Sequence, residues 1–237
     1  MGPKGPQHEK GANVRELYRQ ELAQLGSELE RMGRGVARAI DRATMALRDG
    51  DLAVPEQTID ADERLDENAR QIDEMCIHLL ALQGPVASDL RLILSALRLS
   101  QTMERQGDLA RHIAAIARTT YPTRSIAAPA VEVITKMGEA ATKMGALEEK
   151  LITTQDIAIA DEMQRFDDTL DDLQVEVHRL IADESVELTR QEIVDLTLSA
   201  RFLERFGDHA CSVARRVAYV VEGAHAATTE GGIDAHL

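Results

Sequence analysis

The chain has 237 residues, 44% hydrophobic and 29% charged, so it can bury a core as one large domain or two small ones. Its formal net charge of −14, with no gathered patch of Lys and Arg, argues against nucleic acid as a partner, because a phosphate backbone would be repelled. Only 3% of the residues are aromatic and Trp is missing, a composition that favours long helices over sheets.

Start and stop signals divide the chain into six segments with the apolar periodicity of helices. The fifth segment is expected to be capped by Thr153-Thr154, and the sixth opens with the capping-box pattern Thr189-Arg-Gln-Glu192. Residues 1–13 and 226–237, rich in Gly, Ala, Thr or charge, are expected to lack fixed structure. The six segments run from about 14 to 48, 52 to 82, 85 to 120, 126 to 152, 154 to 182 and 189 to 221.

The two halves of the chain repeat each other. Met32-Gly33 matches Met137-Gly138 at an offset of 105 residues. The third and sixth segments match at an offset of 100, where "ERQGD" at Glu104 corresponds to "ERFGD" at Glu204. The sequence therefore predicts a duplicated three-helix unit, with residues 14–122 as the first repeat and 123–225 as the second. The expected fold is all-α, two pseudo-symmetric three-helix bundles that together form a six-helix protein.

Each half carries two pairs of acidic residues spaced four apart, and a helix presents such a pair on one side, one turn apart. All pairs lie in or beside the apolar stripes of their segments, which places them at the edge of the core. Glycines at 107 and 207 sit between the acids of the third and sixth segments and predict a close backbone approach there. The pairs are Asp62 with Asp66, Glu104 with Asp108, Asp167 with Asp171, and Glu204 with Asp208.

Four partly buried carboxylates from two helices would repel one another unless they were paired, protonated or bound to a cation. Arg105 and Arg205 offer only one basic neighbour per site, and on a helix they point away from the acids. A multivalent cation therefore satisfies the charges best. Oxygen ligands suit hard ions such as Mg²⁺, Mn²⁺ or Ca²⁺, carboxylates can also bridge iron clusters, and zinc is less expected.

Two other interpretations stay open at this stage. The acids could be solvated surface charge on a plain structural bundle, as we expect for Glu148, which has no matched partner in the repeat. The same carboxylates could also serve a metal-dependent hydrolase or oxidase, but no paired nucleophile and base and no phosphate loop is visible. We therefore do not expect an enzyme.

Location follows from what the sequence lacks. Cys76 and Cys211 are too few and too isolated for a disulfide framework or a zinc site, and are expected to be buried in a reducing compartment. The sequence contains no run of about 18 apolar residues, the length needed to span a bilayer, and the first residues lack the apolar stretch of a signal peptide. A cytoplasmic protein is expected.

The duplicated unit, its acid-xxx-Asp pairs, the stretch "QGPVASDLRLILSALR" and the segment "ERFGDHACSVARRVAYVV" together resemble the PhoU family of phosphate-transport accessory proteins. The resemblance spans roughly residues 14 to 225. The second half lacks the Pro-Val-Ala-x-Asp-Leu-Arg stretch, so any role for Asp89 and Arg91 would be one-sided.

The resemblance implies multinuclear metal clusters, of Fe, Mn or Mg rather than Zn, held by the four acids of each half. It also implies a negative regulator of the phosphate-starvation response, often a homodimer, that links the ATPase subunit of a phosphate ABC importer to a sensor histidine kinase. Contact with the membrane would run through those partners alone. PhoU-like proteins also serve other phosphate transporters, so the particular importer stays open.

Overall fold

The computed structural model describes residues 6–49, 53–83, 85, 87–120 and 126–230, and these residues form six long helices and one short 3₁₀ turn. No strand occurs in these ranges. The predicted all-α fold is confirmed. The helices are α1 (Pro6–Asp49), α2 (Ala53–Gln83), α3 (Ala87–Thr120), α4 (Val131–Thr154), α5 (Ile159–Ala182) and α6 (Arg190–Glu230), with the turn η1 (Ala128–Ala130) ahead of α4.

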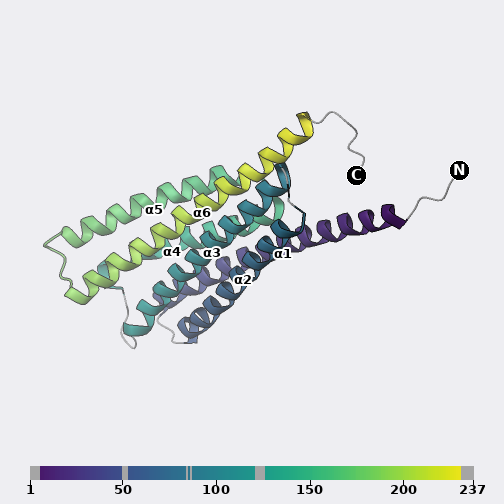
Figure 1. Ribbon diagram of the computed structural model, residues 1–237. Coiled ribbons are helices and arrows are strands. Elements are labelled where there is room, and N and C mark those ends of the chain that lie inside the picture. Colours follow the sequence, from purple (N-terminus) through teal and green to yellow (C-terminus); the bar gives the residue numbers. More distant parts are fainter. Residues whose placement is uncertain (1–5, 50–52, 84, 86, 121–125, 231–237) are drawn as a thin grey trace.

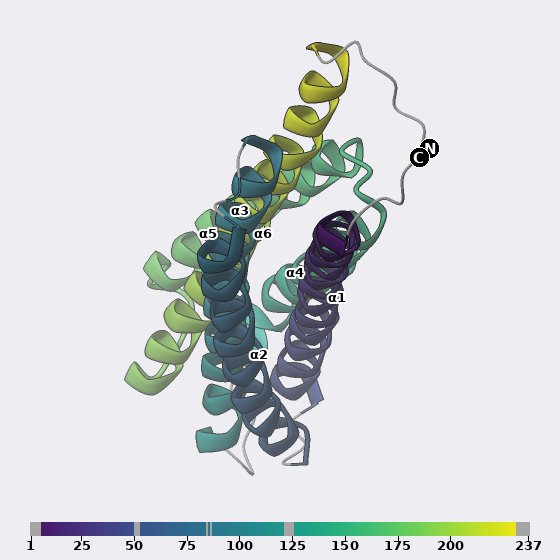
Figure 2. The same cartoon turned by 45° about the vertical axis from the view of Figure 1, so that its right-hand side comes forward.

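The helices lie side by side along a common direction as two bundles of three (Figure 1). In the first bundle α1, α2 and α3 all contact one another, and in the second α4, α5 and α6 do the same. The bundles join through α1 against α4 and α3 against α6, so α2 and α5 lie on the outside (Figure 2). This arrangement places α2 beside α3, and α5 beside α6, as the predicted acid pairs require.

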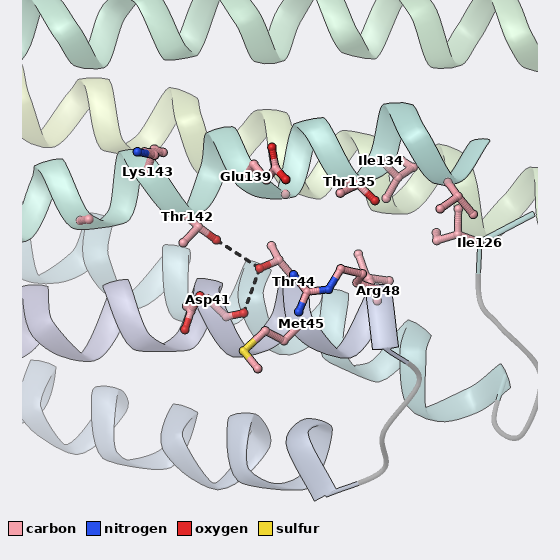
Figure 3. A pocket seen from close by; sticks show the side chains of 14 residues that line it. Asp41, Thr44, Met45, Arg48, Ile126, Ile134, Thr135, Glu139, Thr142 and Lys143 are labelled. Atoms are coloured by element: carbon pink, nitrogen blue, oxygen red, sulfur yellow. Dashed lines mark hydrogen bonds between the residues drawn. The ribbon is translucent and has the colours of Figure 1, made fainter. Parts of the chain in front are cut away.

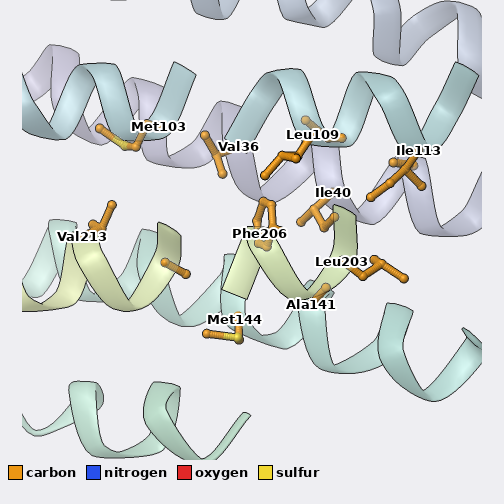
Figure 4. Packing of buried hydrophobic residues seen from close by; sticks show 14 of the residues in the cluster. Val36, Ile40, Met103, Leu109, Ile113, Ala141, Met144, Leu203, Phe206 and Val213 are labelled. Carbon is orange, nitrogen blue, oxygen red and sulfur yellow. The ribbon is translucent and has the colours of Figure 1, made fainter. Parts of the chain in front are cut away.

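The core lies where the two bundles meet. The fully buried ring of Phe206 on α6 points between α1 and α3, toward Val36, Ile40 and Leu109 (Figure 4). The apolar stripes predicted for α3 and α6 are buried over most of their length. Burial of these stripes is the main source of stability, because each fully buried large aliphatic or aromatic side chain contributes about 1.5–3 kcal/mol relative to exposure. Both cysteines are buried, as predicted.

The helix ends agree with the sequence in most places. The capping box forms as expected, since the backbone N–H of Thr189 donates to Glu192 Oε2 at 2.7 Å and the N–H of Glu192 donates to Thr189 Oγ1 at 3.2 Å. Helix α1 begins at Pro6 instead of about residue 14, and α6 continues to Glu230, so part of the predicted unstructured leader and tail is helical. Proline is well suited to a first helical turn, where its missing N–H costs nothing.

The predicted cap of α5 is wrong. The hydroxyls of Thr153 and Thr154 donate to the carbonyls of Glu149 and Lys150, so both threonines belong to the last turn of α4. That helix ends at Thr154 and is capped by Gln155, which adopts a left-handed conformation with φ of 55°. Threonine can bond back to the carbonyl four residues earlier, and a sequence pattern alone does not distinguish this from capping of the next helix.

The expectation that Glu148 is surface charge is also wrong. Its side chain is fully buried on α4, where Gln106 Nε2 of α3 donates to its Oε2 at 2.7 Å. Burial raises the pKa of Glu148 to about 7, although the hydrogen bond from Gln106 opposes the shift. The repeat does not reveal this burial, because the matching position in the first half, Ala43, carries no charge.

Among the described residues, no helix is both long and apolar enough to cross a bilayer.

Candidate metal centre

The acidic pairs of the second half meet across two antiparallel neighbours, α5 and α6. Asp167 and Asp171 lie one turn apart on α5, and Glu204 and Asp208 lie one turn apart on α6. The charge of Asp208 acts on both aspartates of α5, and that of Asp171 acts on Glu204. All four predicted residues of this half therefore share one electrostatic site.

Three acids of this site have raised pKa values. Burial raises the pKa of Asp167 first, and the carboxylates of Asp208 and Asp171 raise it further. Burial and Asp208 likewise raise the pKa of Asp171. The pKa of Glu204, whose residue is 8% exposed, is raised by burial and by both neighbouring aspartates against the lowering effect of Arg201. Such shifts mean that the anionic forms are destabilised and that a bound cation would stabilise them.

The first half repeats this arrangement between α2 and α3. Burial raises the pKa of Glu104, and the carboxylates of Asp66 and Asp108 raise it further. The side chain of Asp62, the fourth predicted ligand, lies outside the described ones. Asp73 on α2 also raises the pKa of Glu104, although it gives no signal in the repeat because its counterpart is His178.

The arginines that hydrogen-bond the acids are Arg111 and Arg201, although the charge of Arg105 also lowers the pKa of Glu104. Arg111 Nη2 donates to Asp108 Oδ1 at 2.6 Å in the first half. In the second half Arg201 Nη1 donates to both oxygens of Glu204, at 2.7 and 2.6 Å. Arg105 and Arg205 are exposed. Helix neighbours at a spacing of three share a face, whereas adjacent residues diverge, so the pairing follows from helix geometry.

A close approach of backbone beside the acids, predicted for Gly207, is confirmed. A Cβ added to Gly207 would lie 2.7 Å from Leu170 Cδ1 and 2.9 Å from Asp167 Oδ1. Cys211, one turn further along α6, is hydrogen-bonded to Asp167, and burial together with that carboxylate raises the pKa of the thiol to about 12. The thiol is therefore neutral and serves as a hydrogen-bond donor to the acid.

The donor set suits a hard cation, because the predicted ligands at each site are carboxylates from two helices, and those that the structure describes repel one another. As the side chains are placed, no three His, Cys, Asp or Glu residues in the described part of the chain gather closely enough to form a ready-made site. Binding of an ion would therefore require rotamer changes at the acids, and Arg111 and Arg201 would have to release Asp108 and Glu204.

An apolar pocket of about 440 Å³ lies apart from these acids, between α1 and α4 (Figure 3). The hydroxyls of Thr44 and Thr142 meet across it at 3.1 Å. Met45 and Ile134 contribute apolar walls, and none of the predicted ligands whose side chains the structure describes lines it. The pocket therefore adds no group to the carboxylate sites.

Fold and site together define a class: an all-α protein of two three-helix repeats, each with carboxylates facing one another across its last two helices. The family model described as PhoU domain matches the chain twice, at residues 29–117 and 134–217. The chain belongs to the PhoU family.

Related proteins support the same assignment. The "Phosphate-specific transport system accessory protein PhoU homolog 2" of Mycobacterium tuberculosis is 35% identical over 211 residues, covering 89% of this chain and 99% of its own. A PhoU homolog of Synechocystis is 30% identical over 214 residues, covering 88% of this chain and 93% of its own.

Solved structures agree on the fold. The crystal structure of PhoU from Pseudomonas aeruginosa matches with a TM-score of 0.76 and 30% sequence identity, over 87% of this chain and 99% of that one. The phosphate transport system regulatory protein PhoU from Streptococcus pneumoniae also has a TM-score of 0.76, at 23% identity, over 93% of this chain and the whole of that one.

Proposed function

We propose that this protein is an accessory regulator of phosphate transport that acts by binding partner proteins. The support is its membership of a family whose named relatives are phosphate-specific transport system accessory proteins, matched over most of both chains. In finer detail, we propose a negative regulator of the phosphate-starvation response in the cytoplasm, which links the ATPase subunit of a phosphate ABC importer to a sensor histidine kinase. The alternative within this class is accessory regulation of a different phosphate transporter.

We further propose that each half binds metal ions through its facing carboxylates. Asp66, Glu104 and Asp108, with Asp62, would be the ligands in the first half. The single observation that carries this proposal is that the acids of α5 and α6 lie together in one partly buried site, where burial first and their mutual repulsion second raise the pKa of three of them. A di- or trivalent ion, Fe, Mn or Mg before Zn, would remove that repulsion and tie the two helices together. In the second half the ligands would be Asp167, Asp171, Glu204 and Asp208.

Elemental analysis of the purified protein tests the metal proposal. We expect bound Fe, Mn or Mg, and a lower melting temperature after chelation, because metal that binds only the folded state stabilises it. Asp171→Asn with Glu204→Gln should remove the metal of the second half only. Asp161→Asn with Glu162→Gln, exposed acids in the first turn of α5, is the matched control and should keep it.

Two results would refute the metal proposal. One is the absence of metal from protein purified without chelator and then supplied with each ion. The other is a wild type whose melting temperature does not rise when metal is added, together with a double variant that melts at the same temperature as the chelated wild type. Solvated acids on a plain bundle would give both.

Partner binding needs its own experiment. The net charge of −14 would attract basic surfaces, and salt weakens such attraction. We therefore expect binding to the purified kinase and to the ATPase subunit to weaken between about 0.05 and 0.5 M salt, and to fall again with chelator if the metal sites rigidify the docking surface. Indifference to both would refute this mechanism. Size-exclusion chromatography with light scattering would test the proposed homodimer.

A further inference from the structure

A groove lined by arginines runs between α1 and α2, on the side of α2 that faces α1. It encloses about 470 Å³, and its basic residues come from both helices: Arg31, Arg38 and Arg42 from α1, and Arg64 from α2. Residues 31, 38 and 42 fall on one face of α1, because their spacings of seven and four are close to whole turns. The metal-site acids of this half lie instead between α2 and α3.

Most of the positive charge in this groove is not neutralised. Arg38, Arg42 and Arg64 form no ion pair with the residues that the structure describes. Glu67 also lines the groove, but its carboxylate is paired with Arg70 at 2.6 Å. In a chain with a net charge of −14, three unpaired guanidinium groups in one concave site are a local exception that favours a bound anion.

The second repeat lacks this feature. At the offset of 105 residues, Arg31 and Arg38 correspond to Lys136 and Lys143, while the counterparts of Arg42 and Arg64 are Leu147 and Thr169. Lys136 is itself paired with Glu132 at 2.6 Å. The basic groove is therefore a property of one half and not a consequence of the fold that both halves share.

We propose that this groove binds an oxyanion ligand that carries a chain of several phosphoryl groups, such as a linear polyphosphate or the phosphate tail of a nucleotide. Guanidinium groups suit this ligand because they donate paired hydrogen bonds to phosphate oxygens and stay charged. The proposal goes beyond the regulatory role above and does not depend on the carboxylate sites.

The geometry requires an extended ligand. Arg31 and Arg42 are eleven residues apart on α1, about 16 Å along the helix. Arg31 does not swing toward Arg42, because its guanidinium is paired with Glu28 and held against α2 by Asn68 Oδ1 at 2.8 Å and Gln71 Oε1 at 2.8 Å. A single tetrahedral oxyanion would therefore contact one end of the groove only.

The floor of the groove is a close contact between α1 and α2. Gly35 lies between the arginine turns of α1, and a Cβ added there would come within 2.7 Å of Leu65 Cδ2. The matching residue of the second repeat is Ala140. The first half thus combines a close helix contact, in which Leu65 covers Gly35, with arginines on both sides of it.

Isothermal titration of the full chain with sodium tripolyphosphate tests the proposal. The protein is first freed of metal and the chelator is removed, because tripolyphosphate itself binds metal ions. The test variant combines Arg38→Gln, Arg42→Gln and Arg64→Gln, and keeps Arg31, which contacts α2. The matched control removes three positive charges from α4, at exposed positions, with Lys136→Gln, Lys143→Gln and Lys150→Gln.

We expect tripolyphosphate to bind the arginine variant more than about tenfold more weakly than the wild type, since each hydrogen bond to a charged group is worth about a factor of ten or more. The lysine control should change by less than about threefold, because distant exposed charges are screened. Orthophosphate should bind the wild type more than about tenfold more weakly than tripolyphosphate. Parallel titrations with ATP and with longer polyphosphate identify the natural source of the phosphoryl chain.

Several outcomes would overturn the proposal: no binding of tripolyphosphate or ATP at millimolar concentration, an equal loss in the lysine control, or orthophosphate binding as tightly as tripolyphosphate. Tighter binding of a glutamate decapeptide would mean that the groove receives an acidic protein segment. Thermal unfolding of both variants without ligand verifies that they fold, and ligand that raises the melting temperature of the wild type but not of the arginine variant is a second, independent readout.

Discussion

The two carboxylate sites have acids at the same repeat positions, but an arginine pairs with the second acid of α3 in one site and with the first acid of α6 in the other. In the first half Arg111 pairs with Asp108, and in the second half Arg201 pairs with Glu204. The counterpart of Arg111 is Cys211, and the counterpart of Arg201 is Gln101. Both repeats therefore contain the acids but have different cations, which indicates that the acids are not present to hold one particular arginine.

The two halves also differ at the centre of the molecule. Phe206 of α6 fills the core, whereas the matching residue of α3 is Gln106, which donates to the buried Glu148. Gln106 Oε1 and Glu148 Oε1 are buried without a hydrogen-bond partner. At this repeat position the second half therefore contributes an apolar ring, whereas the first half contributes an amide that pairs with Glu148 of α4. The pair joins the two halves and is incompletely satisfied, which is the costlier arrangement.

The largest expected effect on stability comes from removing the buried carboxyl of Glu148. Because the folded pKa of Glu148 is about 7 and its ordinary value 4.5, the carboxyl contributes stability below about pH 4.5 that is lost as the pH rises through 7. Glu148→Gln stays neutral and could donate to Gln106 Oε1. We expect its free energy of unfolding to gain about 3 kcal/mol on the wild type between pH 4.5 and pH 8, measured by urea denaturation.

The matched control for this experiment is Glu139→Gln, at an exposed position of the same helix, which should follow the wild type across the pH range. A constant difference between Glu148→Gln and the wild type from pH 4.5 to 8 would mean that the buried carboxyl does not titrate in this interval.

A smaller effect on stability is expected at Gly207, where α5 and α6 pack most closely beside the second site. Gly207→Ala gains about 1 kcal/mol of helix propensity, but its methyl group would collide with Leu170, which is fully buried, and with Asp167. We expect a net loss of about 1 kcal/mol in urea denaturation and weaker metal binding in the second half only. Gly26→Ala, where nothing lies within 4 Å, should instead stabilise the protein. Equal stabilisation by both variants would contradict the close packing inferred at Gly207.

The smallest expected effect concerns the cation of the second site. Arg201 is half-exposed, with 53% of its side chain accessible, while the Glu204 side chain is only 10% accessible. In metal-free protein at pH 7, Arg201→Gln should lower the free energy of unfolding by no more than about 1 kcal/mol, because solvent screens the pair. Arg205→Gln, the exposed neighbour, should change it by less. If Arg201→Gln also tightens metal binding, the arginine and the metal compete for Glu204.

The sequence by itself determined what is local along the chain. Apolar periodicity, turn residues and the capping box at Thr189 placed six helices to within a few residues at most ends, and the internal repeat paired the acids. These signals are readable because helix hydrogen bonds and side-chain faces depend only on residues a few positions apart. The errors at Thr154 and at the first turns of α1 fell at helix ends, where neighbouring conformations differ little in free energy.

The tertiary structure alone decided which residues from separate helices meet. The burial of Glu148 against Gln106, the partnership of Cys211 with Asp167 and the gathering of Arg64 with the arginines of α1 all depend on helix register and crossing. A residue's charge or polarity gives no information about the partner across an interface. That partner is set by how the apolar faces pack together, and packing involves the whole molecule at once.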